Sequence, residues 1–115
     1  MDTTADNLNR YRDIIENLLT EVRHMTQDRN GYEYRTLFDR RSDSYALICV
    51  GWEGKKRVHH FVIHLEIING KVWLQEDNTD LVIADDLERA GIPKSDIVLG
   101  FHPPHIRPLT DYAAA

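Results

Sequence analysis

The first part of the chain places apolar side chains with a helical period. Between Leu8 and Met25 these side chains recur at steps of three and four residues, and charged side chains fill the positions between them. This spacing is typical of an amphipathic helix that buries one face. The segment Arg29-Asn30-Gly31 interrupts the pattern, so we expect the helix to stop there.

From Tyr34 onward the apolar positions follow a period of two, which is typical of strands with one buried face. The dipeptide Asn69-Gly70 predicts a two-residue type I′ turn, because both central residues of that turn need a positive φ. The alternation and the turns together predict strands at about Tyr34–Asp39, Ser44–Trp52, Arg57–Ile68 and Lys71–Glu76.

The two-residue turns set the expected register of these strands. Counted back from Asn69-Gly70, the expected pairs are Ile67 with Val72, Leu65 with Leu74, Glu66 with Trp73 and His64 with Gln75. Counted back through the turn Glu53-Gly54-Lys55-Lys56, they are Ile48 with Phe61 and Ala46 with Ile63. One apolar sheet face follows for the helix to cover, made of Ala46, Ile48, Val50, Phe61, Ile63, Leu65, Ile67, Val72 and Leu74.

The reverse face of the predicted sheet is unusually apolar for a surface in contact with water. It carries Tyr45, Leu47, Cys49, Val58, His60, Val62, His64, Glu66 and Trp73. Either the proline-rich tail of the chain folds over this face or another chain covers it.

A shorter helix is expected near Leu81–Ala90, because Gly91 suits the left-handed position after a helix and Pro93 prevents its continuation. The sequence therefore predicts an α+β fold. An N-terminal amphipathic helix packs on an antiparallel meander of four to five strands, followed by a short second helix and a proline-rich C-terminal segment. At 115 residues the chain supports one hydrophobic core, so we expect a single domain over residues 1–115.

Composition narrows the class of protein. The hydrophobic share of 42% and the charged share of 29% are those of an ordinary globular protein. The first residues are polar and the apolar runs are short, so we expect no signal peptide and a cytoplasmic location. Cys49 is the only cysteine, which excludes an internal disulfide and a thiolate metal cluster.

A net charge of −5 argues against a DNA-binding surface. The basic clusters Arg40-Arg41 and Lys55-Lys56-Arg57 fall in successive hairpin turns, which a strand holds roughly 25–30 Å apart. Neutralising a row of phosphates needs bases gathered on one face. We therefore expect protein contact rather than direct DNA contact.

Six histidines raise the hypothesis of a metal site. His60 and His64 share a face of the predicted strand but lie about 13 Å apart, too far for one ion. His102 and His105 are closer in sequence, but Pro103 and Pro104 hold the segment extended, and no further ligand lies in the loop. We predict no metal and no cofactor.

One part of the sequence is superficially similar to a nuclease motif. Asp39 or Asp43, followed by Glu53-Gly54-Lys55, superficially matches the acidic residue and Glu-x-Lys motif of metal-dependent nucleases. Such sites need carboxylates that converge from a buried strand. Because Glu53-Gly54-Lys55 is expected in a solvated hairpin turn, we predict no catalytic residue.

The C-terminal segment 96–112 combines apolar residues with three prolines and two histidines, and it has no period of its own. Prolines reduce the entropy lost on binding, and Arg and Tyr are frequent binding anchors. A tail that only caps the sheet is an equally good explanation. The candidate partner-binding residues are Trp73, His102, Pro103, Arg107 and Tyr112.

Six blocks of residues resemble a known family in their order and spacing. They are Tyr11-Arg12-Asp13-Ile14-Ile15, Val50-Gly51-Trp52, His64-Leu65-Glu66-Ile67, Val72-Trp73-Leu74-Gln75, Gly91-Ile92-Pro93 and Val98-Leu99-Gly100-Phe101-His102. The family is that of the XisI-like excision-controlling factors. The resemblance implies control of the excision of a chromosomal DNA element, alongside a recombinase and a companion nuclease-like protein, and it brings no enzymatic mechanism.

We therefore expect a regulatory, non-catalytic protein that contacts the companion nuclease-like protein and forms a homo-oligomer. One alternative is a small metal-dependent enzyme or metal-binding domain that uses His102 and His105. Direct DNA binding is the other.

Overall fold

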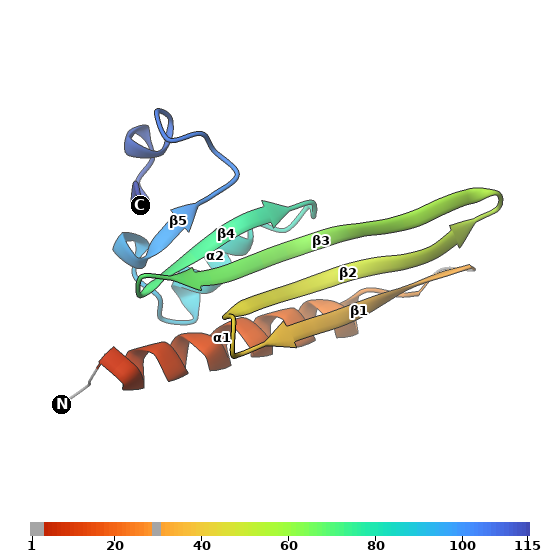
Figure 1. The fold of residues 1–115 in the computed structure, drawn as a ribbon, viewed down its shortest axis with the longest axis horizontal. Coiled ribbons are helices and arrows are strands. Elements are labelled where there is room, and N and C mark those ends of the chain that lie inside the picture. Colours follow the sequence, from red (N-terminus) through yellow and green to blue (C-terminus); the bar gives the residue numbers. More distant parts are fainter. Residues whose placement is uncertain (1–3, 29–30) are drawn as a thin grey trace.

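The computed structural model describes residues 4–28 and 31–115 and contains two helices and five strands (Figure 1). The helices are α1 (Thr4–Met25) and α2 (Ile83–Arg89), and the short 3-10 turns are η1 (Lys94–Asp96) and η2 (Arg107–Leu109). The strands are β1 (Tyr32–Asp39), β2 (Ser44–Glu53), β3 (Lys56–Ile68), β4 (Lys71–Asp77) and β5 (Ile97–Leu99). The predicted helix stop at Arg29-Asn30 lies outside the described residues.

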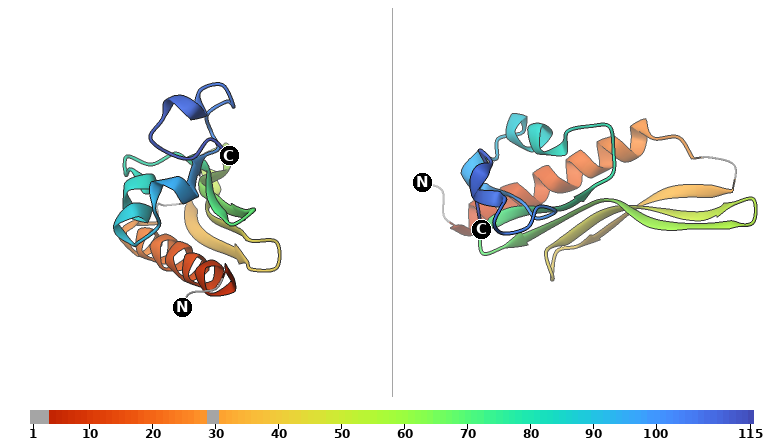
Figure 2. Two further views of the ribbon diagram at one scale, coloured as in Figure 1. Left: turned by 90° about the vertical axis from the view of Figure 1, so that its left-hand side faces the viewer. Right: turned by 90° about the horizontal axis from the view of Figure 1, so that it is seen from above.

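The strands form one sheet in the order β1-β2-β3-β4-β5. The first four are antiparallel neighbours, as predicted, whereas β5 pairs with β4 in parallel. This difference arises because α2 carries the chain back along the sheet before β5 begins. Both helices lie on one face of the sheet (Figure 2), so the predicted α+β class is confirmed. Neither described helix combines the length and apolar character that a membrane span requires.

The turn and the helix end that the sequence predicts most clearly adopt the expected backbone conformations. Asn69 and Gly70 have φ values of 50° and 79°, and the pairs Ile67 with Val72 and Leu65 with Leu74 follow from their turn. After α2, Gly91 adopts a φ of 114°. Its N–H donates to the Glu88 carbonyl (3.0 Å), and the N–H of Ile92 donates to the Leu87 carbonyl (3.1 Å). These two bonds form a Schellman motif that ends the helix.

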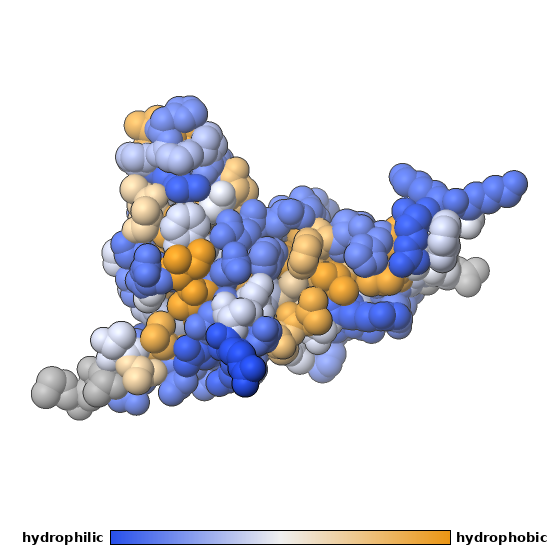
Figure 3. Space-filling model, in the orientation of Figure 1, coloured by the Kyte–Doolittle hydropathy of each residue, from blue (hydrophilic) through white to orange (hydrophobic). Residues whose placement is uncertain are grey.

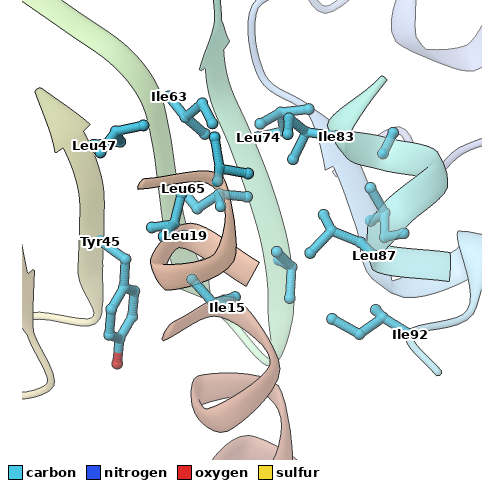
Figure 4. Packing of buried hydrophobic residues seen from close by; sticks show 14 of the residues in the cluster. Ile15, Leu19, Tyr45, Leu47, Ile63, Leu65, Leu74, Ile83, Leu87 and Ile92 are labelled. Atoms are coloured by element: carbon cyan, nitrogen blue, oxygen red, sulfur yellow. The ribbon is translucent and has the colours of Figure 1, made fainter. Parts of the chain in front are cut away.

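The core lies between the two helices and the covered face of the sheet (Figure 4). The buried residues of α1 recur at about one turn of helix, and those of α2 face them. Representative members from both layers are Ile15, Leu19, Leu47, Ile63, Leu65, Leu74, Ile83 and Leu87.

A β-bulge in β3 decides which side chains enter that core. Leu47 pairs with Ile63, but the next residue, Ile48, pairs with Phe61, so Val62 has no residue opposite it. The extra residue reverses the alternation of faces along β3. Val62 and Ile63 are consequently both buried in the core, whereas Phe61 is 40% exposed.

The bulge overturns part of the predicted register. Ala46 pairs with His64 rather than Ile63, and a second irregularity in β4 places Glu76, not Gln75, opposite His64. The pair of Ile48 with Phe61 is confirmed, but its predicted face is wrong. Two sets of residues lie on the face opposite to the one predicted for them. Tyr45, Leu47, Cys49, Val58 and Val62 lie on the helix side, and Ala46, Ile48, Val50 and Phe61 lie on the reverse side.

A further consequence concerns the two histidines of β3. His60 pairs with Cys49, which faces the core, while the ring of His64 stacks on Phe61 with centroids 5.0 Å apart. The two side chains therefore point to opposite faces, and the prediction that they share one is wrong.

The turn between β1 and β2 is tied to α1 by a partly buried ion pair. Arg12 contacts Asp43 through Nε and Oδ1 (2.8 Å) and through Nη2 and Oδ2 (3.1 Å), and the hydroxyl of Tyr45 donates to the same carboxylate (2.9 Å). The Arg12 guanidinium lowers the pKa of Asp43, against the opposing effect of burial. Arg40 in the same turn binds Glu16 (2.7 Å) and Asp13 (2.8 Å) of the helix.

Replacing Asp43 by Asn tests this anchor, and Asn tolerates the φ of 52° found there. At neutral pH we expect the variant to lose about 2 kcal/mol of unfolding free energy, because a bidentate charged contact is lost. Since the folded pKa of Asp43 is lowered, this contribution is present above the unfolded pKa of about 4 and is lost as the pH falls further. Urea unfolding should show that the difference in unfolding free energy between the two proteins, the gap, narrows as the pH falls below about 4. A gap independent of pH would contradict this role.

Candidate partner-binding site

The C-terminal tail packs against the outer edge of β5 and is not spread over the reverse face of the sheet (Figures 1 and 2). Tight turns shape it, with N–H···O=C bonds from Ile106 to Pro103 (2.9 Å) and from Leu109 to Ile106 (2.9 Å). Its end returns to β5, where the N–H of Ala113 donates to the Ile97 carbonyl (2.9 Å). The tail is thus a folded element, which also covers one edge of the sheet.

Three of the predicted residues meet on the side of the sheet away from the helices. Trp73 points there because its neighbours Val72 and Leu74 point into the core. The guanidinium carbon of Arg107 lies 4.9 Å from the centroid of the Trp73 ring, a cation–π contact, and Nε of Arg107 donates to the carbonyl of His102 (3.0 Å). Trp73, His102 and Arg107 therefore form one cluster that holds the start of the tail.

Gly100 permits this close packing of the tail. A Cβ at this position would lie 2.4 Å from Oε1 of Gln75 and 3.2 Å from Cε3 of Trp73. Only a residue without a side chain fits at that distance unless the Gln75 side chain moves. The glycine therefore leaves room for the side chains of Gln75 and Trp73 where the chain runs from β5 into the tail.

Tyr112 lies apart from this cluster, on the side of α2. Its hydroxyl donates to Oε2 of Glu88 (2.9 Å), and Nζ of Lys94 lies 5.6 Å from its ring centroid. Burial, followed by the hydrogen bond to Glu88, raises the pKa of Tyr112 to about 12. Tyr112 thus fastens the end of the tail, and the predicted residues do not form a single surface.

The outer side of the tail exposes apolar groups that the sequence reasoning did not select. Phe101 is 49% exposed and Leu109 is 79% exposed, and Pro103 is exposed as well. The sequence did carry a signal for them, because Phe101 and Leu109 stand on either side of the three prolines. We call Phe101, Pro103 and Leu109 the tail surface.

A second apolar region lies on the reverse face of the sheet, which Figure 3 shows toward the viewer. Leu37 is 56% exposed, and a shallow hollow is lined by Leu37, Ile48, His59, His60 and Phe61. We call Leu37, Ile48 and Phe61 the open-face patch. The sequence reasoning missed this patch because it placed Ile48 and Phe61 beneath the helix.

The residues considered for metal binding, nuclease activity and thiol chemistry lie in different environments. Within residues 4–28 and 31–115, no three His, Cys, Asp or Glu side chains are grouped to hold a metal ion. Asp39 caps its turn by accepting bonds from the N–H of Arg41 (2.9 Å) and the hydroxyl of Ser42 (2.9 Å), which lower its pKa. Glu53 and Lys56 flank the two-residue hairpin loop Gly54-Lys55. Cys49 is buried, and burial raises the pKa of its thiol.

Comparison with known proteins decides the family. A family model described as XisI protein matches residues 5–114, which is nearly the whole chain. The chain belongs to the XisI family. No curated protein matches it.

Two solved XisI structures from Anabaena variabilis ATCC 29413 are similar over their full length. The crystal structure of an XisI-like protein is 36% identical, with a TM-score of 0.91 over 94% of this chain and 99% of that chain. The crystal structure of fdxN element excision controlling factor XisI is 42% identical, with a TM-score of 0.85 over 96% of this chain and all of that chain.

Several blocks that carry the XisI resemblance occupy junctions of the structure. Tyr11 donates a hydrogen bond to Asp96, and burial, aided by this bond, raises its pKa to about 12. Arg12 holds the first hairpin turn, Gly91 ends α2, and Gly100 lies against Trp73. These positions fix α1, the sheet and the tail relative to one another.

Replacing Arg107 by Ala tests the anchoring of the tail. We expect limited proteolysis to cleave the tail about tenfold faster, because the contacts to Trp73 and to the His102 carbonyl are both lost. Thermal unfolding of the core should change little, since Arg107 lies outside the core cluster. Arg107→Lys retains a cation over the ring and should give an intermediate rate. Unchanged cleavage in Arg107→Ala would contradict the anchor.

Proposed function

We propose that this chain is a regulatory protein in the excision of a chromosomal DNA element and that it is not itself a catalyst. The observation that carries the proposal is its 42% identity, over almost its entire length, to the protein named fdxN element excision controlling factor XisI. A controlling factor regulates a reaction whose bond-breaking chemistry belongs to other proteins. A protein of this kind works by binding.

The partner in this proposal is the companion nuclease-like protein of the excision system. The tail surface supports contact with a protein, because it presents apolar Phe101 and Leu109 beside Pro103. Arg107 on Trp73 and Tyr112 on Glu88 hold the segment in place before any partner arrives. A surface ordered in advance loses little conformational entropy on binding.

Charge supports the same choice of partner. The net charge is −5, and Arg12 and Arg40 are both engaged with acidic residues of their own chain. An acidic surface suits the basic face of a protein that binds DNA, and opposite charges speed the encounter of such partners. Regulation then consists of covering that basic face and so limiting access of the partner to DNA.

The experiment uses calorimetry to measure the Kd between this chain and the companion nuclease-like protein from the same genome. We expect Phe101→Ser and Leu109→Ser each to raise the Kd about tenfold or more, because each removes an apolar contact. Trp52→Ser is the matched control, since Trp52 is similarly exposed but lies at the far end of β2. Its Kd should stay close to that of the unmodified protein.

Two results would count against the proposal. One is the absence of any binding between the folded proteins. The other is equal weakening by Trp52→Ser and by the two tail variants, which would place the contact elsewhere.

A further inference from the structure

The two edges of the sheet are treated differently by the fold. The tail covers the edge at β5, where Ala113 bonds to Ile97. β1 forms the other edge, and within residues 4–28 and 31–115 no strand lies on its outer side (Figure 1). β1 spans eight residues, pairs with β2 without a bulge and contains no proline, so short length, a bulge and proline do not protect this edge.

The backbone groups that β1 turns outward follow from two hydrogen bonds. The Gly31 carbonyl accepts a bond from the N–H of Trp52 (2.8 Å), so the odd-numbered positions face β2. The N–H of Tyr34 bonds instead to Oδ1 of Asp28 (3.0 Å), which caps one outward group. By the same period, Thr36 and Phe38 direct their N–H and C=O groups away from the sheet.

Side chains near these groups are apolar on both faces of the strand. Leu37 belongs to the open-face patch. Phe38 lies on the side of the helices, with its ring 6.1 Å from that of Tyr45, and is still 36% exposed. An exposed edge with apolar residues on both faces favours addition of another strand.

We propose that a second copy of this chain occupies this edge, with the two β1 strands antiparallel and Leu37 opposite the partner's Leu37 on the two-fold axis. The outward groups of Thr36 then bond to those of the partner's Phe38, and the reverse pair follows by symmetry. The two five-stranded sheets become one continuous sheet.

Charge favours this register over two of its neighbours and favours a second copy as the occupant. Arg35 comes to lie opposite the partner's Asp39, which pairs opposite charges, and the Asp28 cap on Tyr34 remains in place. Pairing Thr36 with the partner's Thr36 would set Glu33 against the partner's Asp39. Pairing Thr36 with the partner's Tyr34 would set Arg35 against the partner's Arg35. Both of these registers oppose like charges.

The dimer joins the two open-face patches at the axis and leaves the tails at its two outer ends. The reason is that β1 and the tail lie at opposite edges of the same sheet. Such a dimer presents two copies of the tail surface, which allows bivalent attachment to a partner. The inference rests on the geometry of β1 and stands independently of the proposed function.

Cysteine cross-linking tests the register in the full chain. In Leu37→Cys the two new thiols face each other across the axis, in a pair whose Cα atoms are about 4.5 Å apart, so mild oxidation should give a covalent dimer in high yield. Arg35→Cys is the matched control on the same face. Its Cα atoms would be about 13 Å apart, beyond the reach of a disulfide. Cys49 is buried and present in both variants.

Sedimentation equilibrium tests the pairing without a cross-link. Thr36→Pro removes an outward N–H, which costs the monomer no internal bond, and should raise the Kd of the dimer about tenfold or more. Thr36→Ala retains that N–H and should change the Kd by less than about threefold. Circular dichroism verifies that both variants are folded.

Three results would overturn the inference. The first is a purely monomeric protein at the highest concentration it tolerates. The second is dimerisation of folded Thr36→Pro with the Kd of the unmodified protein. The third is efficient cross-linking through Arg35→Cys instead of Leu37→Cys, which would establish a different register.

Discussion

One extra residue in the longest strand governs both surfaces of the sheet. At Val62 the chain places two consecutive apolar side chains in the core, and from there the alternation runs with opposite phase toward each end of β3. β2 and β1 alternate without interruption, and their pairing with β3 on either side of the bulge places Cys49 on the helix side and Leu37 on the open face. The bulge therefore buries one set of side chains beneath α1 and leaves the open-face patch uncovered.

The rest of the structure builds on this division between a filled and an open face. The helices close the core on one side, and the Arg12–Asp43 pair holds the first hairpin to α1. At the other edge of the sheet the tail is held from both sides, by Arg107 on Trp73 and by Tyr112 on Glu88. The fold thus covers the β5 edge with its own chain and leaves the edge at β1 and the tail surface exposed.

Local signals in the sequence are reliable guides to this structure, and long-range packing is not. Asn69-Gly70 and Gly91 carry their conformations in their own backbone preferences, so the turn and the helix end were predictable. The bulge depends on how Val62 and Ile63 pack in the core, and in the sequence only the apolar run Phe61-Val62-Ile63 hints at it. Likewise, a strict period of two could not reveal that Arg107 reaches Trp73 while Tyr112 turns to α2, because those contacts join distant segments.

The most direct test of the face assignment compares two adjacent residues of β2 by urea unfolding. Leu47 is fully buried, whereas Ile48 lies on the open face. Leu47→Ala should therefore cost about 2–5 kcal/mol of unfolding free energy, and Ile48→Ala less than about 1.5 kcal/mol. The opposite order, with Ile48→Ala the more costly, would mean that the strand keeps an uninterrupted alternation and that the bulge at Val62 does not form.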